Sequence, residues 1–250
     1  MFRRVSLALC GVLLALPLVT HAQQKVIHLT SLDWPPYSGA QLPEQGASVA
    51  VAKAAAKAMG YELKVDFLPW ARAVAAAESG AGGVVGYFPE YHSADVASRF
   101  VLSNPIGSGP LGFVEQRAAP VTWNALTDLA GKPIGTVRDY VNTDAFDRMA
   151  AEGKLSVEVV NDDATNLKKV AAGRIPLAVI DRYVMNYLLS HDASLKSLAD
   201  KLQFNAKLLE DKQLYIAFQK SPAGEEAAKV INDGLKKIDV AAIVAPYFAN

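Results

Sequence analysis

The sequence predicts an α/β protein built from two similar lobes with a cleft between them. Before residue 98 the apolar pattern alternates as β-α-β-α-β, and after residue 117 the same alternation begins again. The stretch between them, Ser98–Arg117, holds two short β-rich apolar runs around an interval with Pro105, Gly107, Gly109 and Pro110. Because glycine relaxes the backbone and proline fixes φ, this interval suits a connector at which the chain changes direction.

The first 22 residues have the three regions of a cleaved secretory signal peptide. Arg3 and Arg4 form a basic start, residues 5–19 are mostly apolar, and Thr20-His21-Ala22 matches a small-x-small cleavage site. The apolar run is shorter than the roughly 20 residues that a membrane anchor needs. We therefore expect an exported, periplasmic protein whose mature part has no cysteine, because Cys10 lies inside the leader.

The charge balance argues against nucleic acid as a partner. The chain has 25 basic and 25 acidic residues, and removing the two leader arginines leaves 23 basic residues. There is no basic run and no interleaving of basic with aromatic residues, which a nucleic-acid surface would need. After the leader no apolar segment is long enough to span a bilayer, so we expect a soluble globular protein.

The first half predicts strands whose carboxyl ends lead into aromatic loops. Strands are expected at residues 26–30, 62–68 and 84–88, and helices at 47–59 and 70–79. Ligands of α/β proteins bind beyond the carboxyl ends of strands, so side chains at these positions are candidates to contact a ligand. They are Trp34, Tyr37, Trp70, Arg72, Phe88 and Tyr91. Core packing of the aromatic rings and a solvated helix charge for Arg72 are the alternatives.

The second half predicts the same alternation. Strands are expected at residues 133–137, 157–160, 177–180, 202–209 and 214–218, with helices at 126–132, 143–151, 164–172, 182–189 and 223–238. Arg138 and Asp181 follow strand ends and join the candidate ligand contacts. The adjacent carboxylates of Asp162 and Asp163 are typical of a helix N-cap, and we assign them that role.

No catalytic, metal or cofactor signature is present in the sequence. His28, His92 and His191 are scattered without metal-ligand spacing, and there is no serine nucleophile elbow or dinucleotide fingerprint. The glycines at residues 80–83 precede a strand instead of joining a strand to a helix, so they do not form a phosphate loop. A cleft without such groups favours binding over catalysis, with no metal and no cofactor.

Five segments, in order and spacing, make the mature chain resemble the family 3 extracellular solute-binding proteins, the periplasmic receptors of polar amino acid ABC transporters. They are Trp34-Pro35-Pro36-Tyr37, Leu68-Pro69-Trp70-Ala71-Arg72, Phe100-Val101-Leu102-Ser103-Asn104-Pro105-Ile106, Leu129-Ala130-Gly131-Lys132-Pro133-Ile134-Gly135 and Ala172-Gly173-Arg174-Ile175.

The resemblance implies a type II periplasmic-binding-protein fold whose two lobes are joined by two hinge-crossing strands and close on a ligand. It places residues 23–107 and 213–250 in lobe 1 and residues 108–212 in lobe 2. It also implies a small-molecule ligand, an ABC permease in the inner membrane as partner, and a monomer.

Two positions depart from the family pattern. The resemblance implies an arginine a few residues before the F-x-x-S-x-P segment, where it would bind the ligand carboxylate, but Val96 stands there. The Gly-Thr/Ser pair expected after the first strand of the second lobe is replaced by Asp139-Tyr140-Val141, whereas Asp181 matches the acid that pairs with a ligand ammonium. A buried carboxylate without a cation is costly, so a standard amino acid would need Arg72 or Arg138 instead.

The ligand expected from these residues is small and polar: amino acid-like, an amine or an organic acid. The aromatic candidates also favour a positively charged ligand through cation–π contacts. Two alternatives stay open at this point. The first is a sensory binding protein of the same fold, and the second is an enzyme similar to the cyclohexadienyl dehydratases, which would need the missing arginine.

Overall fold

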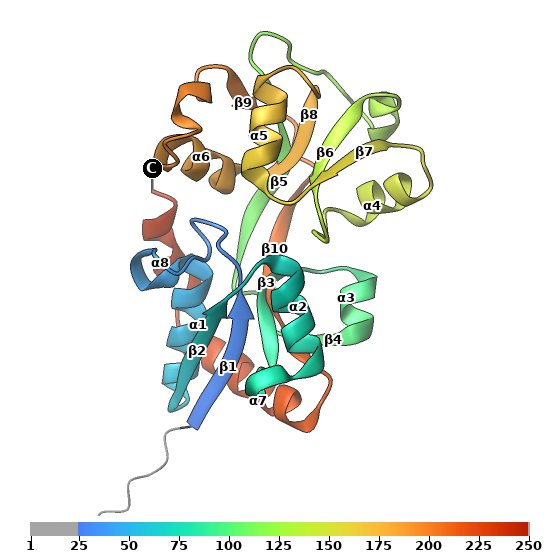
Figure 1. Cartoon of the computed structure of the whole chain (residues 1–250). Helices are drawn as coiled ribbons and strands as arrows, with labels where there is room; N and C mark the ends of the chain where they lie inside the picture. Colours follow the sequence, from blue (N-terminus) through green and yellow to red (C-terminus); the bar gives the residue numbers. More distant parts are fainter. Residues whose placement is uncertain (1–24, 250) are drawn as a thin grey trace, which may run out of the picture.

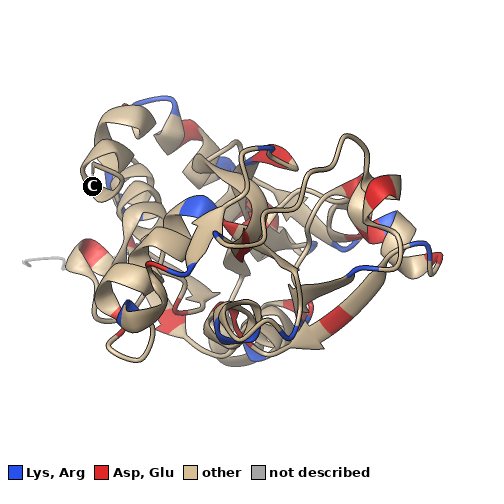
Figure 2. Cartoon of the chain, turned by 90° about the horizontal axis from the view of Figure 1, so that it is seen from above, with Lys and Arg blue, Asp and Glu red and all other residues tan. Residues whose placement is uncertain are grey.

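The computed structural model describes residues 25–249, which form two α/β halves joined by two long strands (Figure 1). The expected leader, residues 1–22, lies outside the described residues. Within residues 25–249 we find no helix with the length and apolar character needed to cross a membrane. Seen from above, basic and acidic positions are interspersed over both halves, and neither sign gathers into one broad area (Figure 2).

The lower half in Figure 1 is built from the first four strands and five helices. The strands are β1 (Lys25–Ser31), β2 (Tyr61–Phe67), β3 (Gly86–Tyr91) and β4 (Phe100–Leu102). The helices are α1 (Ala47–Ala58), α2 (Trp70–Ser79), α3 (Ala94–Arg99), α7 (Pro222–Leu235) and α8 (Val240–Val244).

The upper half holds β6 (Pro133–Val137), β7 (Ser156–Val160), β8 (Leu177–Asp181) and β9 (Leu202–Phe204). Its helices are α4 (Asp144–Ala151), α5 (Asp163–Ala171) and α6 (Arg182–His191). Short 3₁₀ segments complete the chain: η1 (Pro43–Gln45), η2 (Ala81–Gly83), η3 (Leu126–Leu129), η4 (Lys196–Leu198) and η5 (Ala245–Tyr247).

Two strands, β5 (Gly107–Gln116) and β10 (Glu210–Gln219), pass between the halves and pair with each other antiparallel. β10 also pairs with β3 and β4, and β5 also pairs with β8 and β9. The sheet order is therefore β2-β1-β3-β10-β5-β8-β6-β7. The Gly- and Pro-rich interval at residues 105–110 lies at the start of β5, where the sequence predicted that the chain changes direction.

The strand directions bring one set of loops together. β1, β2 and β3 are parallel to one another, as are β6, β7 and β8. Because β3 is antiparallel to β10 and β8 is antiparallel to β5, both sets of strands end at the gap between the halves (Figure 1). The loops that follow six strands therefore meet there, which is where α/β proteins place their binding sites.

Most predicted helices and strands are confirmed within one to three residues at each end, but three strands differ, and the helix expected at residues 126–132 is the 3₁₀ segment η3. The strand expected at residues 84–88 continues to Tyr91, because Glu90 and Tyr91 pair with β10. The ladder changes register opposite Phe88 and Pro89, so the missing N–H of Pro89 costs no regular hydrogen bond. The run at 202–209 is a strand only over Leu202–Phe204. The strand expected at 214–218 is β10, which begins four residues earlier, at Glu210.

Candidate functional site

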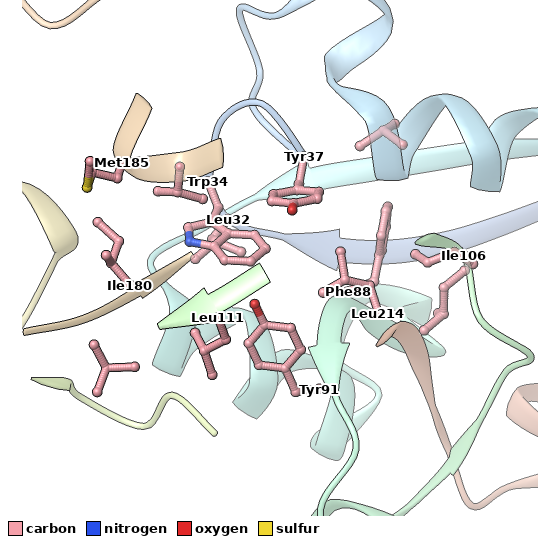
Figure 3. Close-up of a cluster of buried hydrophobic side chains, with 14 of the residues drawn as sticks. Leu32, Trp34, Tyr37, Phe88, Tyr91, Ile106, Leu111, Ile180, Met185 and Leu214 are labelled. Atoms are coloured by element: carbon pink, nitrogen blue, oxygen red, sulfur yellow. The ribbon is translucent and has the colours of Figure 1, made fainter. Parts of the chain in front are cut away.

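The loop after β1 presents two stacked aromatic rings to the gap between the halves. Trp34 and Tyr37 lie with ring centroids 4.6 Å apart and planes inclined by 21°. The backbone of Trp34 donates to the Ser38 carbonyl oxygen at 2.8 Å, which holds the loop in a tight turn. Tyr91, at the end of β3, meets Trp34 edge-on at 6.1 Å, and its hydroxyl points toward the indole (Figure 3).

Hydrogen bonds between loops join the halves directly, and two of them are well defined. The Tyr37 hydroxyl donates to Asp181 Oδ2 at 3.0 Å, and Trp70 Nε1 donates to the Asp139 carbonyl oxygen at 3.0 Å. Trp70 also contacts the edge of the Tyr140 ring at 6.0 Å. We call the two hydrogen bonds the closing contacts, because each one links a loop of the lower half to a loop of the upper half.

Asp181 is anchored at the end of β8, where it caps helix α6. Its Oδ1 accepts from the backbone N–H groups of Tyr183 at 2.8 Å and Val184 at 3.2 Å, which leaves Oδ2 for Tyr37. Gly109 on β5 lies against this pair, and a Cβ there would overlap both Tyr37 Oη and Asp181 Oδ2. The glycine at this hinge position is therefore required for the Tyr37–Asp181 contact.

The C-terminal segment covers the same contact. The Phe248 ring stacks on Tyr183 at 4.4 Å and lies tilted against Tyr37 at 5.2 Å. Tyr37 belongs to the lower half and Tyr183 to the upper half, so Phe248 packs against both sides of the closed gap. The end of the described chain therefore adds apolar contact to the closed arrangement.

Two neighbouring cavities lie between the halves. The inner cavity, of about 30 Å³, is bordered by Trp34, Trp70, Tyr91, Tyr140 and Leu214. The outer cavity, of about 320 Å³, is bordered by Glu78, Tyr87, Asp95, Val96, Arg99 and Asp139. Glu90 borders both. The inner cavity has room for only about two or three water molecules, whereas the outer one reaches the size of small-ligand sites.

Three carboxyl groups are buried around these cavities: Glu90, Asp163 and Asp181 are 5%, 7% and 2% exposed. Burial raises the pKa of each of them to about 7. Hydrogen bonds oppose this rise in pKa. They come from Tyr87 to Glu90, from Trp34 to Asp163 and from the α6 backbone to Asp181. The site therefore holds carboxyl groups that change charge near neutral pH.

The charged groups around each carboxyl differ. Lys212 and Arg99 lower the pKa of Glu90, and the Lys212 ammonium lies 5.4 Å above the Tyr91 ring. Asp181 and Asp162 raise the pKa of Asp163, and Asp211 raises that of Asp181. Glu90 thus has cations nearby, whereas the charges that act on Asp163 and Asp181 are all negative.

The tyrosine hydroxyls of the site are also affected by burial. Burial is the main cause that raises the pKa of Tyr37, Tyr91 and Tyr140 above the usual value, and the nearby carboxylates add to it. Tyr91 Oη is fully enclosed and has no hydrogen-bond partner. A buried hydroxyl without a partner is unfavourable and uncommon, so this atom is available to a ligand.

The predicted contact residues fall into two groups. Trp34, Tyr37, Trp70, Tyr91 and Asp181 meet between the halves. Phe88 is 0% exposed and packs in the core beside the site (Figure 3). The Arg72 and Arg138 side chains lie on the surface and border neither the inner nor the outer cavity.

Three residues that the sequence did not single out as ligand contacts also lie here: Glu90, Tyr140 and Asp163. The predicted N-cap role is confirmed for Asp162, whose Oδ1 accepts from the Thr165 backbone at 2.7 Å. Asp163, one position further along the helix, points to the buried side and does not cap the helix. Tyr140 turns into the gap because Asp139 adopts a left-handed conformation, with φ of 61°.

Comparison with known proteins gives matches in structure but not in sequence. No protein-family model matches the chain, and no curated protein matches its sequence. A histidine kinase sensor domain with similarity to periplasmic binding proteins matches with a TM-score of 0.74 and 22% identity, over 90% of this chain and 96% of that one. An ancestral arginine-binding protein bound to arginine matches with a TM-score of 0.73 and 16% identity, over 90% and 99%.

The GluR0 ligand-binding core from Nostoc punctiforme, in complex with L-glutamate, matches with a TM-score of 0.70 and 18% identity, over 90% of this chain and all of that one. These similarities decide the fold. The chain has the two-lobed fold of the periplasmic binding proteins. The lower and upper halves are its lobes, and the gap that holds both cavities is its interlobe cleft.

The position that the resemblance singles out for a carboxylate-binding arginine can be placed in the cleft. Val96 borders the outer cavity, so the position at which the resemblance implies a carboxylate-binding arginine presents an apolar side chain. Arg99 borders the same cavity, but its guanidinium contacts Asp95 at 3.0 Å and Glu78 at 3.4 Å. Of the described residues that border either cavity, Arg99 is the one that carries a positive charge.

Replacing Tyr37 by phenylalanine is expected to open the ligand-free cleft. The change removes the hydrogen bond to Asp181 and keeps the aromatic packing. Such a bond contributes about 0.5–1.5 kcal/mol when Asp181 is protonated and about 1.5–3 kcal/mol when it is charged. Small-angle X-ray scattering should show a larger radius of gyration for Tyr37→Phe than for the unmodified protein. Tyr61→Phe, whose hydroxyl contacts Glu226 on the surface, is the control. An unchanged radius in Tyr37→Phe would contradict a closing role for this bond.

The ligand-free protein is expected to lose stability as pH rises from about 4.5 to 7. Glu90, Asp163 and Asp181 keep their protons in the folded state up to a pKa of about 7, whereas the unfolded chain releases them near pH 4. The unfolded state thus binds fewer protons in this window. Each group then lowers the free energy of unfolding by up to about 1.4 kcal/mol per pH unit.

Urea unfolding at pH 5, 6 and 7 measures this dependence. The midpoint should fall with rising pH, and Glu90→Gln should make the decline shallower because one of the three titrating groups is gone. A midpoint that stays constant or rises between pH 5 and 7 would be incompatible with three protonated carboxyls in the cleft.

Proposed function

We propose that this protein is a family 3 solute-binding protein that captures a small polar ligand in its interlobe cleft. The observation that carries the proposal is the convergence of loops from both lobes on two neighbouring cavities, with a buried carboxyl group and an unpartnered hydroxyl at their border. Buried polar groups that meet in a concave apolar site are typical of small-molecule binding. The fold supplies the means of closure, because two strands connect the lobes.

The proposed contacts are the aromatic and acidic groups that face the cleft. Trp34, Trp70, Tyr91 and Tyr140 would enclose the ligand, and Glu90 would bind its polar group. Tyr37 and Asp181 contact each other in the closed form, so a ligand that reaches Asp181 would replace the Tyr37 hydroxyl. Arg72 and Arg138 stay outside this set, because both lie on the surface away from the two cavities.

The proposed partner is an ABC permease of the inner membrane, to which a monomeric periplasmic protein delivers its ligand. Two features support this proposal: the expected leader and the similarity in fold to an ancestral arginine-binding protein. A sensory role is the second candidate, because a histidine kinase sensor domain matches the chain equally well in fold. Neighbouring genes for a permease or for a sensor kinase would distinguish the two roles.

An enzymatic role receives less support. The proteins described above as structural matches are a receptor core, a binding protein and a sensor domain. A dehydratase similar to the cyclohexadienyl enzymes would need an arginine for the substrate carboxylate, and Val96 occupies that place in the outer cavity. We therefore propose binding without turnover, which an assay with prephenate or arogenate would check.

The proposed function predicts that a small polar ligand raises the melting temperature of the protein. At a 100-fold excess over Kd, one bound ligand adds about 2.7 kcal/mol to the free energy of unfolding. Thermal unfolding should be followed with a panel of amino acids, amines and organic acids, each at millimolar concentration. If no compound of any of these classes shifts the transition, the proposal of a free-standing solute receptor fails.

A further inference from the structure

The border of the interlobe cavities is acidic. Glu78, Glu90, Asp95 and Asp139 border the outer cavity, against the single positive charge of Arg99. Arg99 is already engaged by Glu78 and Asp95, so Glu90 and Asp139 are left without a direct ionic partner at this border. A cavity of this kind concentrates cations and repels anions.

The inner cavity adds groups that bind an organic cation. The faces and edges of Trp34, Trp70, Tyr91 and Tyr140 surround it, and aromatic faces attract ammonium groups. Tyr91 Oη is buried without a partner and can accept a hydrogen bond from an N–H group. Asp163 and Asp181 lie behind the rings, and their negative charge raises the pKa of the Tyr91 hydroxyl.

A ligand carboxylate finds no comparable partner in this cleft. Val96 is apolar, and the loop after β6 presents Asp139 and Tyr140. Lys212 is buried nearby with its ammonium 5.4 Å from the centre of the Tyr91 ring, but that ammonium already contacts Glu210 at 3.5 Å and the His92 carbonyl oxygen at 3.5 Å. An anionic group in the inner cavity would therefore be desolvated close to three carboxyls, which is unfavourable.

From this arrangement we infer that the ligand is an organic cation without a carboxylate, held by Glu90 and Tyr91 Oη between the aromatic walls. The walls must separate to admit it, because the inner cavity of the closed structure, about 30 Å³, holds only about two or three water molecules. This inference rests on the proposed function and narrows its ligand class. In the empty site the buried carboxyl groups are neutral because they hold protons. When a cation binds, these groups release protons, and the positive charge of the ligand neutralises the carboxylates instead. Amines with a free carboxylate, which include the standard amino acids, are the class that the cleft rejects.

The experiment compares amino acids with the amines that remain when the carboxylate is removed. Phenylalanine with phenethylamine, arginine with agmatine and lysine with cadaverine are three such pairs, and titration calorimetry at pH 7.5 measures each affinity. In at least one pair the amine should bind tenfold or more tightly than its amino acid. The inference is overturned if each amino acid that binds has an affinity equal to or higher than that of its amine. The solute-binding function would stand in that case.

A different outcome would remove both proposals. If none of the six compounds binds, and no compound of the wider thermal panel does, the protein is not a receptor for a small polar ligand. If only organic acids bind, the function stands and the inference is overturned. The two failures are therefore distinguishable in the same set of measurements.

Tyr91→Phe separates ligand binding from structure. Because Tyr91 Oη has no partner in the ligand-free protein, its removal should leave the melting temperature of the empty protein unchanged or higher. The affinity for the amine should fall by about fivefold or more. Tyr215→Phe is the control. The Tyr215 hydroxyl, on β10, contacts Gln213 of its own strand at the protein surface. An unchanged amine affinity in Tyr91→Phe would contradict the contact.

The neighbouring aspartates of α5 supply a second matched pair. Asp163→Asn and Asp162→Asn each remove one carboxylate from the same helix end, and asparagine caps helices as well as aspartate. Asp163 faces Trp34 in the cleft whereas Asp162 is exposed. Asp163→Asn should weaken amine binding severalfold and Asp162→Asn less than twofold. Equal effects from the two variants would overturn the role of the buried charge.

Discussion

A carboxyl group buried in a protein must be protonated, hydrogen-bonded or paired with a cation, because its bare charge is costly away from water. Glu90, Asp163 and Asp181 meet this constraint together between the two lobes, with pKa values raised to about 7 by burial. In the closed form hydrogen bonds from Tyr87, Trp34 and Tyr37 supply part of what they need. The rest must come from protons or from a bound cation, and this requirement is the basis of the ligand class that we propose.

The fold explains why these groups meet. Three parallel strands in each lobe end at the same gap, and the two strands that join the lobes hold the gap at one place. Closure is then stabilised by the protein itself through Tyr37–Asp181 and Trp70–Asp139, with Phe248 packed over the first of them. Under the proposed function, a ligand that replaces the Tyr37 hydroxyl on Asp181 must offset the loss of that hydrogen bond.

Sequence patterns were sufficient for the parts of the site that depend on local order along the chain. Strand ends can be recognised from alternation and from Gly and Pro, so the sequence alone is enough to group Trp34, Tyr37, Trp70, Tyr91 and Asp181. Asp163 could not, because the same Asp-Asp pair signals an N-cap and only the helix rotation decides which carboxylate turns inward. Likewise the continuation of β3 to Tyr91, which places Glu90, depends on pairing with β10 far along the chain.

The central claim is that a bound cation replaces protons on the buried carboxyl groups. The number of protons released on binding tests this claim most directly. Phenyltrimethylammonium is a suitable probe of the charge exchange alone, since it carries a fixed positive charge, has no proton to release and offers no N–H group to Tyr91 Oη. Calorimetric titration at pH 7 in two buffers of different ionisation enthalpy gives the number of protons exchanged. The account predicts a release of about one proton per bound cation, because a nearby positive charge lowers the pKa of carboxyls that titrate near 7. Binding with no proton exchange, or with proton uptake, would contradict it.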